Sequence, residues 1–141
     1  MIEALLALNA GSSSLKFELA RSHRIDAPLL RGAAERLGGP EAVLTLEGDR
    51  QARARQSLGA ADHRTVLDVL GGIIAERHPD LRLCAVGHRI VHGGPRLTRP
   101  VVVTQAVLDE LEALTALAPL HQPHGITGIR IARDLYPEAA Q

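Results

Sequence analysis

The chain has 141 residues, of which 45% are apolar, and its 16 basic side chains are balanced by 16 acidic ones. This length fits one domain or a piece of a larger protein, and the balanced charge argues against a nucleic-acid partner. The single cysteine, Cys84, excludes an internal disulfide and a CxxC site, so a reducing, cytoplasmic setting is expected. No stretch is long and apolar enough to predict a membrane span, and no basic residue precedes the first apolar run as in a signal peptide.

The first third of the chain predicts an antiparallel β meander. An apolar run, Leu5–Leu8, is followed by Leu15–Leu19, where apolar and polar residues alternate as in a strand. Asn-Ala-Gly-Ser-Ser-Ser between these runs is typical of a hairpin turn. Further pairing is predicted over Leu29–Ala34, over Val43–Glu47 with a turn at Glu47-Gly48-Asp49, and over Gln51–Ser57.

Beyond Ser57 the spacing of apolar residues becomes helical. A helix is predicted after a possible N-cap at Asp62 and ends before Pro79. The later predicted elements are a buried strand over Leu83–Val91, a helix capped by Thr104 that runs through Leu117 to Pro119, and a helix from about His124 to Leu135. This order fits one α/β layer domain over residues 1–141. Such a fold normally returns to the sheet after a helix, so we expect that the chain is truncated.

The hairpin concentrates residues that are rare elsewhere. It holds the chain's one asparagine, Asn9, and its one lysine, Lys16, on either side of a Gly-Ser turn. Such a turn offers backbone N–H groups and hydroxyls to phosphate oxygens, and a lysine adds a compact positive charge. Asn9 could hold a hydrated cation through its amide oxygen. The alternative is an ordinary turn that binds nothing; it is not a P-loop, because a strand is predicted to follow it.

The stretch VGHRIVHGG, residues 86–94, contains a second candidate anion site. In a strand, Arg89 and Val91 would share one face, where an arginine fork matches a carboxylate and a valine packs against a short alkyl group. The alternative is a structural ion pair between Arg89 and an acidic residue. His88 and His92 would share the other face about 13 Å apart, too far to ligate one metal, so both are interpreted as structural.

The stretch APLHQPHG, residues 118–125, places His121 in a loop between two prolines. Its imidazole could donate to a phosphoryl oxygen, and the N–H groups at the start of the next helix would favour an anion. The alternative is a surface histidine, and His124 has a weaker claim to a functional role. The remaining histidines, which we interpret as surface residues, are His23, His63 and His78.

The segments NAGSSSLKF, GHRIVHGG and LAPLHQPHGITGI together resemble the signatures of acetate kinase and its acyl-kinase relatives. The resemblance implies a ribonuclease-H-like domain of the actin-like ATPase and sugar kinase superfamily. It also implies transfer of the γ-phosphoryl group of ATP to acetate, with Mg²⁺, giving acetyl phosphate and ADP. Relatives are longer and dimerise mostly through a second domain, so the chain resembles their N-terminal domain alone, and a homodimer is expected of the full-length enzyme.

The resemblance also implies roles for single residues. They are Asn9 for the metal, Ser12, Ser14 and Lys16 for the nucleotide phosphates, Arg89 for the carboxylate and the phosphoryl group, Val91 and Leu120 for the substrate methyl, and His121 for the phosphoryl group in transfer. The sequence departs from the family pattern at Pro95, Gln122 and His124, where an acidic residue, an asparagine and a small or amide residue are usual.

The family's catalytic aspartate, second active-site arginine, adenine-binding motif and metal-associated glutamate lie downstream of the matched region. The resemblance therefore predicts that the isolated 141-residue fragment is inactive. Two alternatives remain open: a non-catalytic module that binds phosphate or nucleotide, and a kinase for propionate or butyrate.

Overall fold

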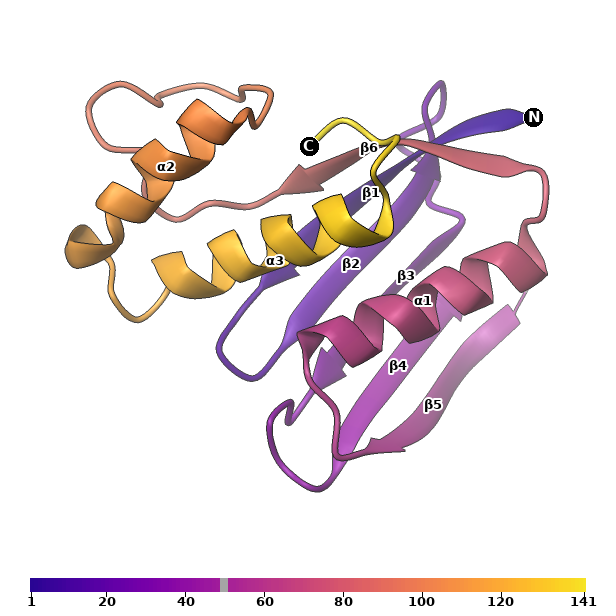
Figure 1. The fold of residues 1–141 in the computed structure, drawn as a ribbon. Helices are drawn as coiled ribbons and strands as arrows, with labels where there is room; N and C mark the ends of the chain where they lie inside the picture. The colour runs from indigo at the N-terminus through magenta and orange to yellow at the C-terminus, as the bar shows by residue number, and fades with distance from the viewer. Residues whose placement is uncertain (49–50) are drawn as a thin grey trace.

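A computed structural model describes residues 1–48 and 51–141, and its centre is a six-stranded sheet with two helices lying across one face (Figure 1). The strands are β1 (Ile2–Ala10), β2 (Leu15–Arg21), β3 (Leu30–Glu35), β4 (Ala42–Gly48), β5 (Gln51–Gly59) and β6 (Leu81–His88). The helices are α1 (His63–Arg77), α2 (Gln105–Ala113) and α3 (Gln122–Leu135), with a 3₁₀ turn over Thr115–Leu117. The predicted α/β order is confirmed, whereas the predicted turn residue Asp49 lies outside the described residues.

The sheet order is β5-β4-β3-β2-β1-β6. The strands from β1 to β5 pair antiparallel in sequence order, which confirms the predicted meander, and β6 pairs parallel to β1. Because parallel neighbours cannot be joined by a hairpin, α1 carries the chain across the sheet from one edge to the other. The carboxyl ends of β1 and β6 consequently lie side by side.

Alternation along the strands decides which face the helices cover. In β1 the buried side chains are Ala4, Leu6 and Leu8, while Ala7 between them is exposed. The helix α1 adds Val66, Leu67 and Leu70 to the same core, and all three are fully buried. Because the chain has so few aromatics, this core is aliphatic apart from Phe17. The sheet therefore has one face under helices and one that carries exposed polar side chains.

A second, smaller core joins α2 to α3 beyond the β6 edge. Its fully buried members are Leu108, Leu111, Ile126 and Ile129. Thr104 caps α2 as predicted, its hydroxyl accepting from the N–H of Val107 at 3.3 Å. The prediction that this helix runs through Leu117 was wrong. The α-helix ends at Ala113, where Leu114 N–H donates to both Glu110 O and Leu111 O, and a 3₁₀ turn follows.

After α3 the chain returns to the free edge of β6. Ala140 forms an isolated parallel bridge with Ala85, in which Ala140 N–H donates to Cys84 O at 3.0 Å and Val86 N–H donates to Ala140 O at 2.7 Å. The expected return to the sheet thus begins within the chain. None of the helices in residues 1–48 and 51–141 has the length and apolar character needed to cross a membrane.

Candidate functional site

The β1–β2 hairpin places Asn9 directly opposite Lys16. Cross-strand partners project from the same face of a sheet, so the amide and the ammonium share the face opposite to buried Leu8 and Phe17. Lys16 is exposed and Asn9 is half-buried. Within the described part of the chain, neither side chain has a hydrogen-bond or ion-pair partner. Both groups are therefore available to a ligand.

The turn between the two strands is tied to the protein body through its carbonyl groups. Gly11 N–H donates to Ser14 O at 2.9 Å, and Leu37 N–H donates to Ser13 O at 2.9 Å. Among the described residues, the N–H groups of Ser12, Ser13 and Ser14 have no partner. The turn thus has the free donors that the sequence predicted, although the N–H of Gly11 is not one of them.

The ring of His63, at the start of α1, contacts this turn. Its Nε2 lies 2.7 Å from Gly11 O and 3.1 Å from Ser14 O. Since both neighbours are carbonyl oxygens, which only accept, Nε2 must carry a proton and donate. The ring is half-buried, so the interpretation of His63 as a surface residue was wrong.

Arg89 lies just past the end of β6, beside the end of β1. The predicted strand over Leu83–Val91 ends three residues early, at His88, which pairs with Leu8. Arg89 N–H still donates to Leu8 O at 3.0 Å, which fixes its backbone one residue from Asn9. The side chain of Arg89 is exposed and, among the residues that the structure describes, makes no ion pair. The alternative of a structural ion pair is therefore wrong within that part of the chain.

The loop that follows Arg89 is held by Gln122, whose side chain is only 1% exposed. Gln122 Nε2 donates to His92 O at 2.9 Å and to Leu111 O at 3.3 Å, and Gln122 Oε1 accepts from His92 N–H at 3.3 Å. Gln122 is the residue after His121. This clamp fixes the loops that carry Arg89 and His121 relative to each other.

The His-Gly-Gly segment of that loop, residues 92–94, stabilises the conformation of the loop backbone. His92 Nδ1 accepts from Gly94 N–H at 2.9 Å, and Gly94 has a φ of 65°, which favours glycine. A Cβ on Gly93 would lie 2.0 Å from Leu97 O, so only glycine fits there. His88 donates from Nε2 to Gln141 Oε1 at 2.8 Å. The interpretation of His88 and His92 as structural residues agrees with these contacts.

His121 is the exposed N-cap residue of α3, and the helix begins one residue later, earlier than predicted. Its first turn has no spare donors. Gln122 N–H donates to Ala118 O, Pro123 has none, and the N–H groups of His124 and Gly125 both donate to His121 O. The expectation of free N–H groups at this helix start was wrong, so any contact with an anion here falls to the His121 side chain.

The first turn of α3 nevertheless lies against the other elements of the site. A Cβ on Gly125 would be 3.0 Å from Ile90 Cδ1 and 3.6 Å from Arg89 O, so this turn contacts the backbone next to Arg89. The ring of His124 stacks on that of His63, with centroids 6.5 Å apart and planes 10° apart. The carboxyl ends of β1 and β6, the Gly-Ser turn and the starts of α1 and α3 thus meet in one place. Ligands of α/β proteins bind at such carboxyl ends.

Val91 and Leu120, the predicted methyl-pocket residues, are 58% and 76% exposed. The described residues therefore leave both side chains largely open to solvent, and their role stays a prediction. A magnesium site needs oxygen ligands, often carboxylates, and Asn9 offers one amide oxygen. In residues 1–48 and 51–141, no group of three or more His, Cys, Asp or Glu side chains could hold a metal ion. The role of Asn9 toward the metal stays a prediction.

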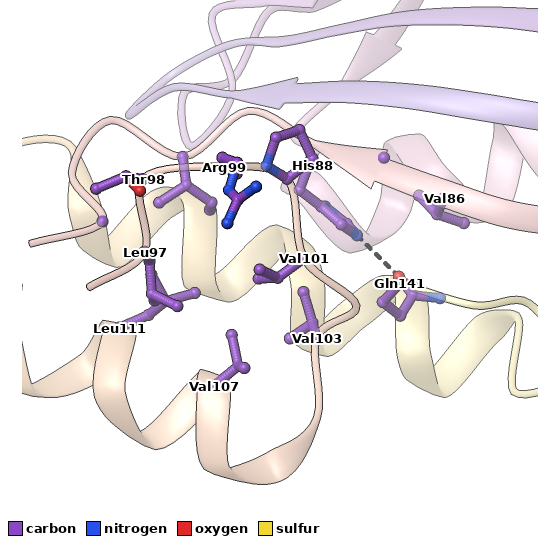
Figure 2. Close-up of a pocket in the computed structure, with 14 residues that line it drawn as sticks. Val86, His88, Leu97, Thr98, Arg99, Val101, Val103, Val107, Leu111 and Gln141 are labelled. Atoms are coloured by element: carbon purple, nitrogen blue, oxygen red, sulfur yellow. Dashed lines mark hydrogen bonds between the residues drawn. The ribbon is translucent and has the colours of Figure 1, made fainter.

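A cavity of about 390 Å³ lies elsewhere, between β6 and α2 (Figure 2). Figure 2 shows valine and leucine side chains directed into this cavity, with His88 hydrogen-bonded to Gln141 at one side. None of the predicted site residues lines this cavity. The site at the strand ends is instead an open surface, on which Lys16, Arg89 and His121 are all exposed.

Reasoning from sequence missed His63 and the clamping role of Gln122. The partners of His63 lie 52 and 49 residues away, and Gln122 reaches a loop 30 residues away. Periodicity carries no signal for such contacts. The one local sign was the Asp62 N-cap, which predicts that His63 occupies the first position of a helix.

Comparison with known proteins places this geometry in one family. A family model described as the acetokinase family matches residues 4–141. The acetate kinase of Deinococcus radiodurans is 42% identical over 139 residues, which cover 94% of this chain and 33% of that protein.

Two solved structures are similar to the fold. A propionate kinase from Francisella tularensis superposes with a TM-score of 0.91 at 32% identity, covering 99% of this chain and 36% of its own. Porphyromonas gingivalis acetate kinase gives 0.88 at 29% identity, again covering 99% of this chain and 36% of its own. The chain spans about a third of the length of the relatives that it matches.

Proposed function

Because the chain belongs to the acetokinase family, we propose that it is the N-terminal domain of a kinase that transfers the γ-phosphoryl group of ATP to acetate. The observation that carries the proposal is Lys16, which has no partner among the described residues and lies opposite Asn9, with the backbone of Arg89 fixed one residue along the neighbouring strand. Two cations and an amide at one sheet end suit two anionic substrates. The homodimer implied by the resemblance and the cytoplasmic setting expected from the single cysteine belong to this proposal.

The proposed chemistry is mostly positioning and charge neutralisation, as in other phosphoryl transfers. When bound, ATP supplies the transferred group. The free N–H groups and hydroxyls of Ser12 and Ser14 hold phosphate oxygens, and Lys16 offsets their charge. The Arg89 fork binds the carboxylate of the acceptor and turns it toward the γ-phosphoryl group. His121 donates an imidazole N–H to a phosphoryl oxygen as negative charge shifts during transfer.

The test is Arg89→Ala in the full reading frame that encodes this chain, assayed for acetyl phosphate from ATP, Mg²⁺ and acetate. We expect kcat/KM to fall by about 10²–10³-fold, as for other charge-stabilising donors used in the transition state. Arg99→Ala is the matched control, because Arg99 is an exposed arginine outside the predicted site. If Arg89→Ala costs no more than Arg99→Ala, the role given to Arg89 is wrong.

Assays of the same full-length protein also test two alternative functions. The similarity to a propionate kinase favours a second candidate acceptor, so kcat/KM is compared for acetate, propionate and butyrate. A ranking led by propionate or butyrate would replace acetate as the substrate. If the protein encoded by the full reading frame binds nucleotide but transfers no phosphoryl group, the chain is a non-catalytic binding module.

A further inference from the structure

We propose that His63 is a positioning residue that aims the N–H groups of the Gly11–Ser14 turn at a bound phosphate. The inference rests on the phosphate-binding role proposed for that turn. It starts from one contact: a single ring nitrogen, Nε2, held between Gly11 O and Ser14 O at 2.7 and 3.1 Å. A bifurcated donor in that position fixes two carbonyl groups of the turn at once.

Peptide geometry links those carbonyls to the donors on the other side of the turn. A trans peptide is planar, and its C=O and the following N–H point in opposite directions; no cis peptide is found among the described residues. Holding Gly11 O against His63 therefore directs the Ser12 N–H away from the protein body. Leu37 N–H holds Ser13 O in the same way and directs the Ser14 N–H outward. His63 thus orients the first of two outward donors.

His63 is itself held in place by its neighbours. Asp62 accepts from Thr65 N–H and from the Thr65 hydroxyl, each at 2.8 Å, which fixes the first turn of α1. These hydrogen bonds, the backbone one first, keep the pKa of the Asp62 carboxyl below its usual value, so the cap stays ionised near neutral pH. On the far side the ring of His124 stacks against His63. His124, one of the departures from the family pattern, therefore packs α3 against His63, the residue that holds the turn.

The test compares side chains that keep or remove the Nε2 donor in the 141-residue chain. His63→Gln places an amide N–H near the position of Nε2, whereas His63→Phe keeps a ring and loses the donor, and His63→Asn is too short to reach both carbonyls. The probes are inorganic phosphate and the Mg²⁺ complex of a non-hydrolysable ATP analogue. Binding is followed by the amide NMR shifts of Ser12, Ser14 and Lys16.

We expect affinity to fall about tenfold in His63→Phe and His63→Asn, the size of one lost hydrogen bond to a charged group, and to stay within about twofold in His63→Gln. The free-state amide shifts of Ser12 should also move in His63→Phe and not in His63→Gln. Rescue by glutamine separates positioning from a general loss of structure. If the phenylalanine variant does not fold, the asparagine variant decides. His23→Phe, at an exposed histidine, is the control and should bind like the native chain.

Two results would overturn the inference, and they are distinguishable. If the native chain binds through the turn and the phenylalanine and asparagine variants bind equally well, His63 does not position the donors, while the proposed function of the turn stands. If neither probe shifts the turn amides of the native chain, the proposed phosphate-binding role fails, and the inference about His63 fails with it.

Discussion

At the scale of single residues, His88 shows how burial sets a charge. It projects toward α3 at the end of β6, where a Cβ on Gly128 would lie 4.0 Å from its Nδ1. Burial lowers the pKa of His88 from its ordinary value of 6.5, and the hydrogen bond to Gln141 opposes this only in part. The folded chain therefore prefers neutral His88, while the unfolded chain takes up a proton near pH 6.5.

This difference predicts a loss of stability in mild acid. As the pH falls below about 6.5 the unfolded state binds more protons at this position, so the free energy of unfolding decreases until the pH reaches the lowered pKa of folded His88, below which the loss levels off. Above pH 6.5 His88 contributes no slope. Urea unfolding at a series of pH values should show a shallower acid-side fall in His88→Gln than in the native chain, with His23→Gln as the control at an exposed histidine. Equal slopes in all three proteins would rule out this role for His88.

At the scale of elements, the sequence predicted what local patterns decide. Alternation located the hairpin strands, and Asp62 and Thr104 were identified as the caps of α1 and α2 because capping depends on neighbours in sequence. The end of β6 was misplaced because an apolar run looks the same in a strand and in a packed loop. Ile90 is apolar since it packs on the second core, after strand pairing has ended. That distinction depends on contacts with α3, which no local pattern contains.

In the loop that follows β6, hydrogen bonds from the Gln122 side chain take the place of strand pairing, and removing them should lower stability. Gln122→Met keeps the length of the side chain but leaves His92 N–H, His92 O and Leu111 O without their amide partner. We expect the free energy of unfolding to fall by about 1–3 kcal/mol, the usual penalty for buried polar groups left unpaired. Gln105→Met, at an exposed glutamine on α2, is the control and should change stability by less than about 0.5 kcal/mol. Equal unfolding midpoints for the native chain and Gln122→Met would contradict the clamp.

At the scale of the whole molecule, the helices α1 and α3 cover one face of the sheet (Figure 1). The other face of β1, β2 and β6 is partly apolar and borders a concavity of about 540 Å³ that includes Leu5, Ala85 and Val102. The candidate site lies where the strands end, and its cations face solvent. Resemblance to a family identified these cations from their motifs, whereas their open surroundings follow from the tertiary fold alone.

Exposure of the site leads to the prediction that the purified 141-residue chain does not turn over. Phosphoryl transfer needs both substrates held in line and kept from water. Here Leu120 is 76% exposed and Val91 58%, and the chain spans about a third of its relatives' length. We expect no acetyl phosphate above background from the chain with ATP, Mg²⁺ and acetate, in an assay calibrated with an active acetate kinase. Acetyl phosphate that appears with the native chain and disappears with Arg89→Ala would show that these residues form a complete active site, because a contaminating kinase would not respond to the substitution.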